Sequence, residues 1–233
     1  MAQTSVSRPG VQTQVNDFVR SVYNWMAIGL GLTGLTAYYT AHNEAMMRII
    51  YGTPGLTFIL FLVVLGFVFF LSARINKIKA STATGLFTIY AILNGVVFSS
   101  IFMIYTASSI FSTFMICSAT FLGCSFYGMV TKKDLTSLGS FMFMGLIGII
   151  IASVVNIFIQ SSAMQMIISY IGVIVFVGLT SYDTQKLKNM SLTMPADATG
   201  SMVRKGAIMG ALTLYLDFIN LFIMLLHLFG DRR

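Results

Sequence analysis

Long stretches of predominantly apolar residues, separated by short polar connections, dominate the chain. Each stretch continues for about 20 positions, which is the length that crosses a bilayer as an α-helix. Because every backbone polar group in lipid needs a partner within the protein, each stretch is predicted to be helical. The predicted helices cover residues 22–42, 53–73, 82–105, 108–130, 139–160, 164–184 and 206–229.

The composition agrees with this pattern, because 57% of the residues are apolar and 9% are charged, against about 25% charged in ordinary soluble domains. The apolar residues do not alternate as barrel strands would. We therefore predict an all-α integral membrane protein with seven transmembrane helices over residues 22–230. Residues 1–21 are predicted to form a polar tail, and the polar, proline-containing residues 185–205 a surface loop.

Lys and Arg residues gather on one side of this topology. Short loops rich in these residues stay in the cytoplasm, so we place the N-terminus in the cytoplasm and the C-terminus outside. Arg232 and Arg233 oppose this assignment, and six spans with a re-entrant final segment are the alternative. The net charge of +7 follows from the topology and implies no nucleic-acid partner. The cations on the predicted cytoplasmic side are Arg8, Arg20, Arg74, Lys77, Lys79, Lys132, Lys133, Lys186, Lys188, Arg204 and Lys205.

Motifs for enzymatic or metal chemistry do not stand out in the chain. His42 and His227 lie near opposite ends and form no HExxH-type pattern, and no glycine-rich phosphate loop occurs. Cys117 and Cys124 are seven positions apart on one predicted helix, about 10 Å along its axis, so they do not bridge. We expect neither an enzyme nor a bound cofactor.

Two acidic residues are more informative, because an ionisable side chain inside a hydrocarbon span is costly and marks a candidate functional site. Asp217 lies near the middle of the last predicted helix, and Asp183 lies at the predicted end of the sixth. The alternative for Asp217 is a carboxyl that hydrogen-bonds a neighbouring helix, and for Asp183 a simple interfacial residue.

The last predicted helix also carries a stripe of small and polar residues along one face. Such a stripe is poorly solvated by lipid, so it is expected to face protein or a water-filled cavity, with Thr213 and Asn220 beside Asp217. We therefore predict that this helix is central in the bundle. The stripe consists of Gly206, Gly210, Thr213, Asp217, Asn220, Met224 and His227.

Two segments, SYDTQKLK from Ser181 and LYLDFINLF from Leu214, resemble the paired signatures of the transmembrane BAX inhibitor motif family. The resemblance covers nearly the whole chain, includes the TKKDL segment from Thr131, and is closest to bacterial-type members. It implies a fold of six helices around a central seventh. It also implies a Ca²⁺ leak activity controlled by two aspartates that sense protons.

Carried over to this chain, the resemblance makes Asp183 and Asp217 the proton sensor and transient Ca²⁺ ligands, and Arg74 the cation that latches them. Two carboxyls at one site do not both ionise cheaply, so the pair is expected to share a proton. Loss of that proton leaves a negative charge for Arg74 or a permeating Ca²⁺ to balance. One departure is that residues 53–73 contain no acid, whereas some relatives have a carboxylate there.

The leading hypothesis is therefore a pH-sensitive cation leak in a bacterial inner membrane, with Ca²⁺ and H⁺ as its ions and the bilayer as its setting. The alternative is a membrane-embedded regulator that binds another membrane protein, such as a protease, through the polar N-terminal tail. Neither hypothesis involves nucleic acid.

Overall fold

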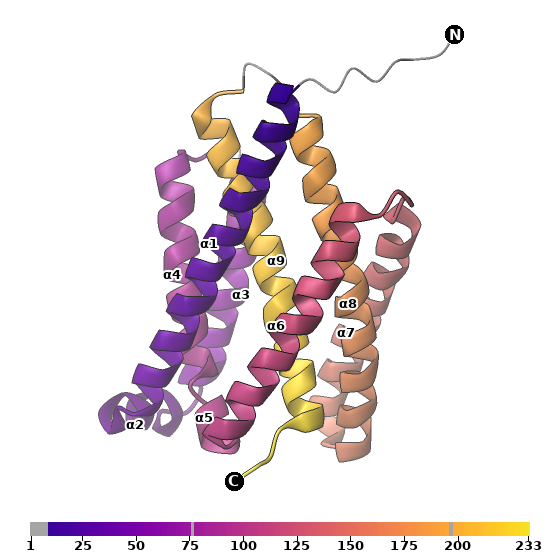
Figure 1. Ribbon diagram of the computed structural model, residues 1–233. Helices are drawn as coiled ribbons and strands as arrows, with labels where there is room; N and C mark the ends of the chain where they lie inside the picture. The colour runs from indigo at the N-terminus through magenta and orange to yellow at the C-terminus, as the bar shows by residue number, and fades with distance from the viewer. Residues whose placement is uncertain (1–8, 76, 196–197) are drawn as a thin grey trace.

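A computed structural model describes residues 9–75, 77–195 and 198–233, with side chains described from Val15 onward. Within these residues the chain is helical almost throughout (Figure 1). The helices are α1 (Pro9–Ala41), α2 (Glu44–Gly52), α3 (Leu56–Arg74), α4 (Ala80–Phe98), α5 (Ile101–Ile104), α6 (Ala107–Val130), α7 (Thr136–Ile159), α8 (Ser162–Leu192) and α9 (Gly200–Phe229).

The last helix, α9, lies at the centre of the bundle (Figure 1). It packs directly against α1, α4, α6 and α8, while α3 packs against α4 and α7 packs against α8. Over a membrane-length window, 61% of α9 is buried, compared with 11% of α3. The prediction of a central last helix is confirmed, and this helix is continuous from Gly200 to Phe229.

In the part of the chain that the structure describes, six helical segments are long and apolar enough to cross a membrane. They are α3, α4 and α5 counted as one, α6, α7, α8 and α9. The chain is thus a multi-pass membrane protein. The first predicted span, residues 22–42, lies within α1 except for His42, and α1 is not among the six although it runs beside them (Figure 1). Glycine, threonine and tyrosine lower the hydropathy of α1, and several of its residues, such as Thr33 and Thr40, are buried against other helices.

Large apolar side chains cover the outside of the bundle, as expected where lipid is the solvent. Phe58 on α3 and Phe158 on α7 lie on the outer surface, where they are 63% and 83% exposed. A water-soluble protein does not expose apolar residues along whole helices in this way. The outer surface of these helices therefore suits acyl chains.

Two predicted boundaries were wrong. The first helix begins at Pro9, so residues 9–21 of the predicted tail belong to α1, while residues 1–8 lie outside the described residues. The predicted loop over residues 185–205 is mostly helix, because α8 continues to Leu192 and α9 already begins at Gly200. Lys, Gln and Leu are good helix formers, so these polar segments prolong helices beyond the apolar run.

Other differences are smaller. The predicted helix over residues 82–105 is divided at Ser99 and Ser100 into α4 and α5, and residues 44–52, which precede the second predicted helix, form the short α2. Asn43 caps α2, since its side chain accepts a hydrogen bond from the backbone N–H of Met46 at 3.0 Å.

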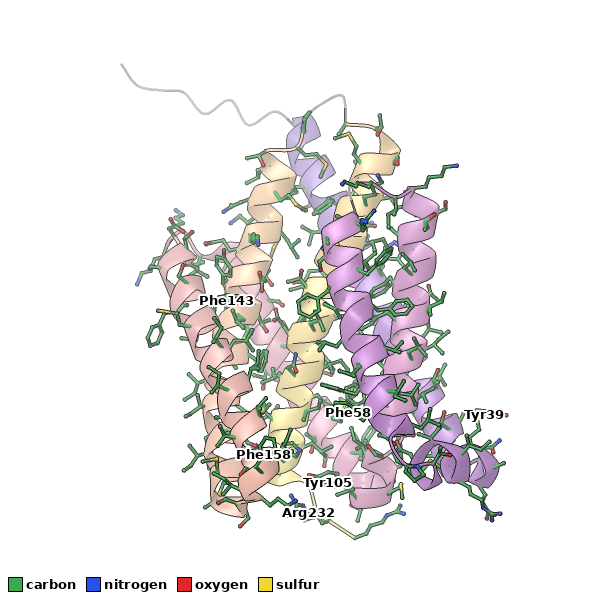
Figure 2. The ribbon with its side chains drawn as sticks, turned by 180° about the vertical axis from the view of Figure 1, so that it is seen from behind. Tyr39, Phe58, Tyr105, Phe143, Phe158 and Arg232 are labelled. Carbon is green, nitrogen blue, oxygen red and sulfur yellow. The ribbon has the colours of Figure 1, made fainter. Side chains whose placement is uncertain are left out.

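Most of the cations gather at the end of the bundle where α1 begins, here called the basic end (Figure 1). The loop from α3 to α4, the loop from α6 to α7, the end of α8 and the start of α9 all lie there. Arg8 and Asp197 lie outside the described residues. Arg48 on α2 and the C-terminal Arg232 lie at the opposite end. There the backbone of Arg232 forms an isolated antiparallel β-bridge with Tyr105 (Figure 2).

Helices α6 and α8 approach closely at Gly128. A Cβ atom built on Gly128 would lie 2.3 Å from the backbone oxygen of Ser181, so the contact has no room for a side chain. Gly123, on the same helix, has no heavy atom within 4 Å of such a Cβ atom. This close approach helps to place the segment of α8 that carries Asp183.

The Gly128→Ala variant is therefore expected to lose about 1–3 kcal/mol of stability through overpacking. Gly123→Ala is the matched control, and it is expected to be neutral or to gain up to about 1 kcal/mol from better helix propensity. Thermal unfolding of both variants in detergent measures the difference. Equal melting temperatures for the two variants would show that α6 and α8 can move apart at Gly128 without loss of stability.

Candidate functional site

The structure brings together the two predicted aspartates, Asp183 on α8 and Asp217 on α9. Asp217 is 5% exposed and Asp183 is half-buried. Their carboxyl groups lie within hydrogen-bonding reach of each other and repel when both are ionised. The Oδ2 atom of Asp217 has no hydrogen-bond partner among the described residues. A carboxyl oxygen buried without a partner is costly, so the site favours a proton or a cation there.

Lys186 is the cation whose charge acts on Asp183. It follows Asp183 by three positions on α8, so the two side chains share one helix face. Its Nζ atom also lies 5.9 Å from the ring centroid of Tyr182. Lys186 falls within residues 185–205, which were predicted to form a loop, although its spacing from Asp183 was the available signal.

Arg74, the predicted latch, lies at the exposed end of α3. The charges that act on either aspartate, among the residues the structure describes, come from Lys186 and from the other aspartate. Arg74 does not line the cleft that contains the aspartates. In this conformation the structure therefore leaves Arg74 apart from the pair.

A cleft of about 550 Å³ opens beside the two aspartates. Helices α7, α8 and α9 form its walls, and Thr213, Asp217 and Asn220 are among the residues that α9 contributes. Thr213 donates to the backbone oxygen of Met209 at 3.1 Å, and Asn220 donates to that of Leu216 at 2.8 Å. Three positions of the predicted stripe, Thr213, Asp217 and Asn220, thus line this cleft.

The cleft offers oxygen ligands, which hard cations such as Ca²⁺ prefer. No group of three or more His, Cys, Asp or Glu side chains suited to a metal occurs in the described parts of the chain. The oxygen atoms that the cleft offers come from two carboxyls, the hydroxyl of Thr213 and the amide of Asn220.

The SYDTQKLK segment docks α8 onto its neighbours by several hydrogen bonds. Gln185 accepts from the backbone N–H of Leu135 at 2.9 Å and donates to the backbone oxygen of Lys133 at 2.8 Å. Lys188 donates to the backbone oxygen of Met129 at 2.7 Å. The Gln185 side chain therefore holds the TKKDL loop, and both contacts restrain the part of α8 beside Asp183.

The opposite face of α9 is anchored by Tyr215, which sequence reasoning did not find. Its hydroxyl lies 2.7 Å from Oγ1 of Thr33 on α1, and Thr33 donates to the backbone oxygen of Ala91 on α4 at 2.8 Å. The Tyr215 ring packs edge-on against Phe87 and Tyr90, with centroids 6.0 and 5.6 Å away. Because positions 215 and 217 are about 200° apart around a helix, α9 holds one wall while presenting Asp217 to the other.

Comparison with known proteins finds relatives that cover nearly the whole chain. The family model described as Bax1-I, inhibitor of apoptosis-promoting Bax1, matches residues 15–233. Inner membrane protein YbhL of Escherichia coli is 48% identical over 226 residues, covering 97% of this chain and 94% of YbhL. A Borreliella burgdorferi protein is 45% identical over 218 residues, which cover 94% of this chain and 93% of that protein. A Streptococcus pyogenes membrane protein is 36% identical, covering 93% of each chain.

The Gln185→Ala variant is expected to lose about 1–3 kcal/mol of stability, because it leaves the backbone groups of Lys133 and Leu135 without their partner. Asn189→Ala removes an exposed amide from the same helix and is the control, with a change within about 0.5 kcal/mol. Thermal unfolding in detergent checks both. A Gln185→Ala protein as stable as the control would mean that water replaces the lost bonds.

Proposed function

The chain belongs to the Bax1-I family, and from this premise we propose that it is a pH-sensitive cation leak pathway whose ion is Ca²⁺. The observation that carries the proposal is the carboxyl pair of Asp183 and Asp217 beside a cleft, with one oxygen of Asp217 lacking a hydrogen-bond partner among the described residues. Intramembrane carboxyls mark ion pathways and proton relays because their burial is costly.

The mechanism follows from the charge of the pair. With one shared proton, the protonated carboxyl donates to the carboxylate, and the pair carries a single negative charge that Lys186 balances. When that proton leaves, a second negative charge appears in the same low-dielectric space. A divalent cation in the cleft then relieves the repulsion, and Ca²⁺ exchanges part of its water for carboxylate, hydroxyl and amide oxygens.

We propose Lys186 as the cation that balances the pair in the conformation described. The Arg74 latch remains a prediction, and it requires the end of α3 to move toward the cleft. Movement of α3 would disturb few contacts with α9, because α3 packs mainly against α4. The proton content of the aspartate pair would set the balance between two arrangements, one with Arg74 apart from the pair and one with Arg74 beside it. It would do so by changing the negative charge that a cation must balance.

We further propose seven spans, with α1 as the first, and the basic end in the cytoplasm. The cations of the loops at the basic end support this orientation. An inner membrane is proposed as the location, since the relative from Escherichia coli is named as an inner membrane protein.

The alternative, a regulator of another membrane protein, is less well supported. It was based on a polar tail over residues 1–21, of which residues 9–21 belong to α1 and pack through Val15 and Phe18. Deletion of residues 2–8 separates the two functions. A regulator that uses this segment would lose partner binding, whereas a leak would keep its flux.

The Asp217→Asn and Asp183→Asn variants are expected to lose the pH dependence of Ca²⁺ flux between about pH 5 and 8, because an amide does not exchange the shared proton. The measurement is Ca²⁺ entry into proteoliposomes that contain the purified protein. The parent is expected to change its flux with pH over the same range. A variant that responds to pH like the parent would remove the sensor role from that aspartate.

Asp134→Asn is the matched control. Asp134 lies in the exposed loop between α6 and α7, and hydrogen bonds from the side chain and backbone of Thr136 hold its pKa below the usual value. A lowered pKa means that Asp134 is already ionised at about pH 5 and stays so up to pH 8. The variant should therefore keep the parental response. If the parent protein itself gives no more flux than empty liposomes at any pH, the leak function is overturned.

A further inference from the structure

The contact between α8 and α9 continues past the aspartate cleft in a regular antiparallel order. Asp183 faces Asp217, then Gly172 faces Met224, and finally Gln165 faces His227. Met224 is about 10 Å beyond Asp217 along the axis of α9, and His227 is about 5 Å further. An apolar contact therefore separates two polar regions on one helix face.

Met224 fills a notch at Gly172. A Cβ atom built on Gly172 would lie 2.7 Å from both Cγ and Sδ of Met224, so the thioether occupies the space that the glycine leaves. The α9 residues that line the cleft end at Asn220, and the α8 residues end at Phe176. Phe176 thus lines the end of the cleft, and the Met224 side chain lies beyond that end.

A second group of polar side chains follows Met224 toward the end of the bundle opposite the basic end. Nδ1 of His227 lies 3.0 Å from Nε2 of Gln165. Asn156 on α7 donates to Oε1 of Gln165 at 3.4 Å, and it accepts from the backbone N–H of Ser161 at 3.0 Å. These side chains, here called the His227 cluster, offer polar partners to a hydrated ion that the apolar contact does not offer.

We propose that Met224, seated in the Gly172 notch, is the apolar barrier that closes the pathway between the aspartate cleft and the His227 cluster. The proposal rests on the leak function and names the place where the leak is shut. Hydrophobic constrictions close ion pathways by excluding water. Methionine suits this role because its unbranched, flexible side chain leaves and refills a notch easily.

The Met224→Ala variant is expected to raise Ca²⁺ flux into proteoliposomes on the order of tenfold at constant pH, because it removes most of the apolar barrier. Met224→Leu refills the notch and is expected to restore flux to near the parental level. Met142→Ala is the matched control: Met142 of α7 fills a similar notch at Gly178 of α8, with Cγ and Sδ 2.6 and 2.7 Å from a built Cβ. It does not line the cleft, and its variant should keep parental flux.

The outcomes separate this proposal from the leak function. Parental flux that responds to pH, combined with unchanged flux in Met224→Ala, overturns the barrier and leaves the leak intact. Raised flux in both Met224→Ala and Met142→Ala also overturns it, because general loosening of α8 would then be the cause. If the parent shows no flux and Met224→Ala does, the barrier is supported. If neither protein shows flux, both the barrier and the leak function are overturned.

Should Met224→Ala fail to fold, Met224→Cys is the smaller change. Its flux should exceed the parental flux and fall again when an alkyl methanethiosulfonate attaches its S-alkyl group to the introduced thiol as a disulfide and releases methanesulfinate. The parent treated in the same way gives the contribution of the native Cys117 and Cys124. Flux at the parental level before treatment would overturn the proposal.

Discussion

The cost of placing a carboxyl group inside a membrane is the constraint on which the rest of this structure depends. A buried, ionised carboxylate is costly unless a charge partner or hydrogen bonds compensate it. Asp217 meets this constraint through Asp183, with which it can share a proton, and Lys186 supplies a positive charge at the edge of the site. A change in the proton content of the pair therefore has to change the surrounding packing, the hydration or the bound ions.

The two faces of α9 have different roles in meeting that constraint. On one face, Tyr215, Thr33 and the backbone of Ala91 join α9 to α1 and α4 through short hydrogen bonds. On the other face, the cleft leaves Asp217 beside side chains of α7 and α8. Because the first face is held by these hydrogen bonds, the proposed sensor would act through α7, α8 and the cleft. The Gln185 contacts with the TKKDL loop join α8 to the start of α7.

The sequence predicted the helical class and the central helix because lipid imposes a strong and regular pattern on composition. Asp217 and Asp183 were both singled out because an acid within or at the end of a long apolar run is conspicuous, and the family resemblance added their roles as a pair. Lys186 was missed because a polar run was interpreted as a loop, although it continues the helix. The Gln185 and Tyr215 contacts were beyond sequence reasoning, since their partners lie 50 and 182 positions away.

The same comparison explains why α1 was harder to classify than α3. Only 11% of a membrane-length window of α3 is buried in the bundle, and the helix is apolar on nearly all sides, so hydropathy identifies it easily. Helix α1 instead packs against α4, α8 and α9, where hydroxyls such as that of Thr33 find protein partners. A helix with protein on several sides is free to carry polar groups, which lower its hydropathy. In this bundle the polar positions of a helix therefore indicate contact with protein, and the stripe on α9 indicates where its partner helices and the cleft lie.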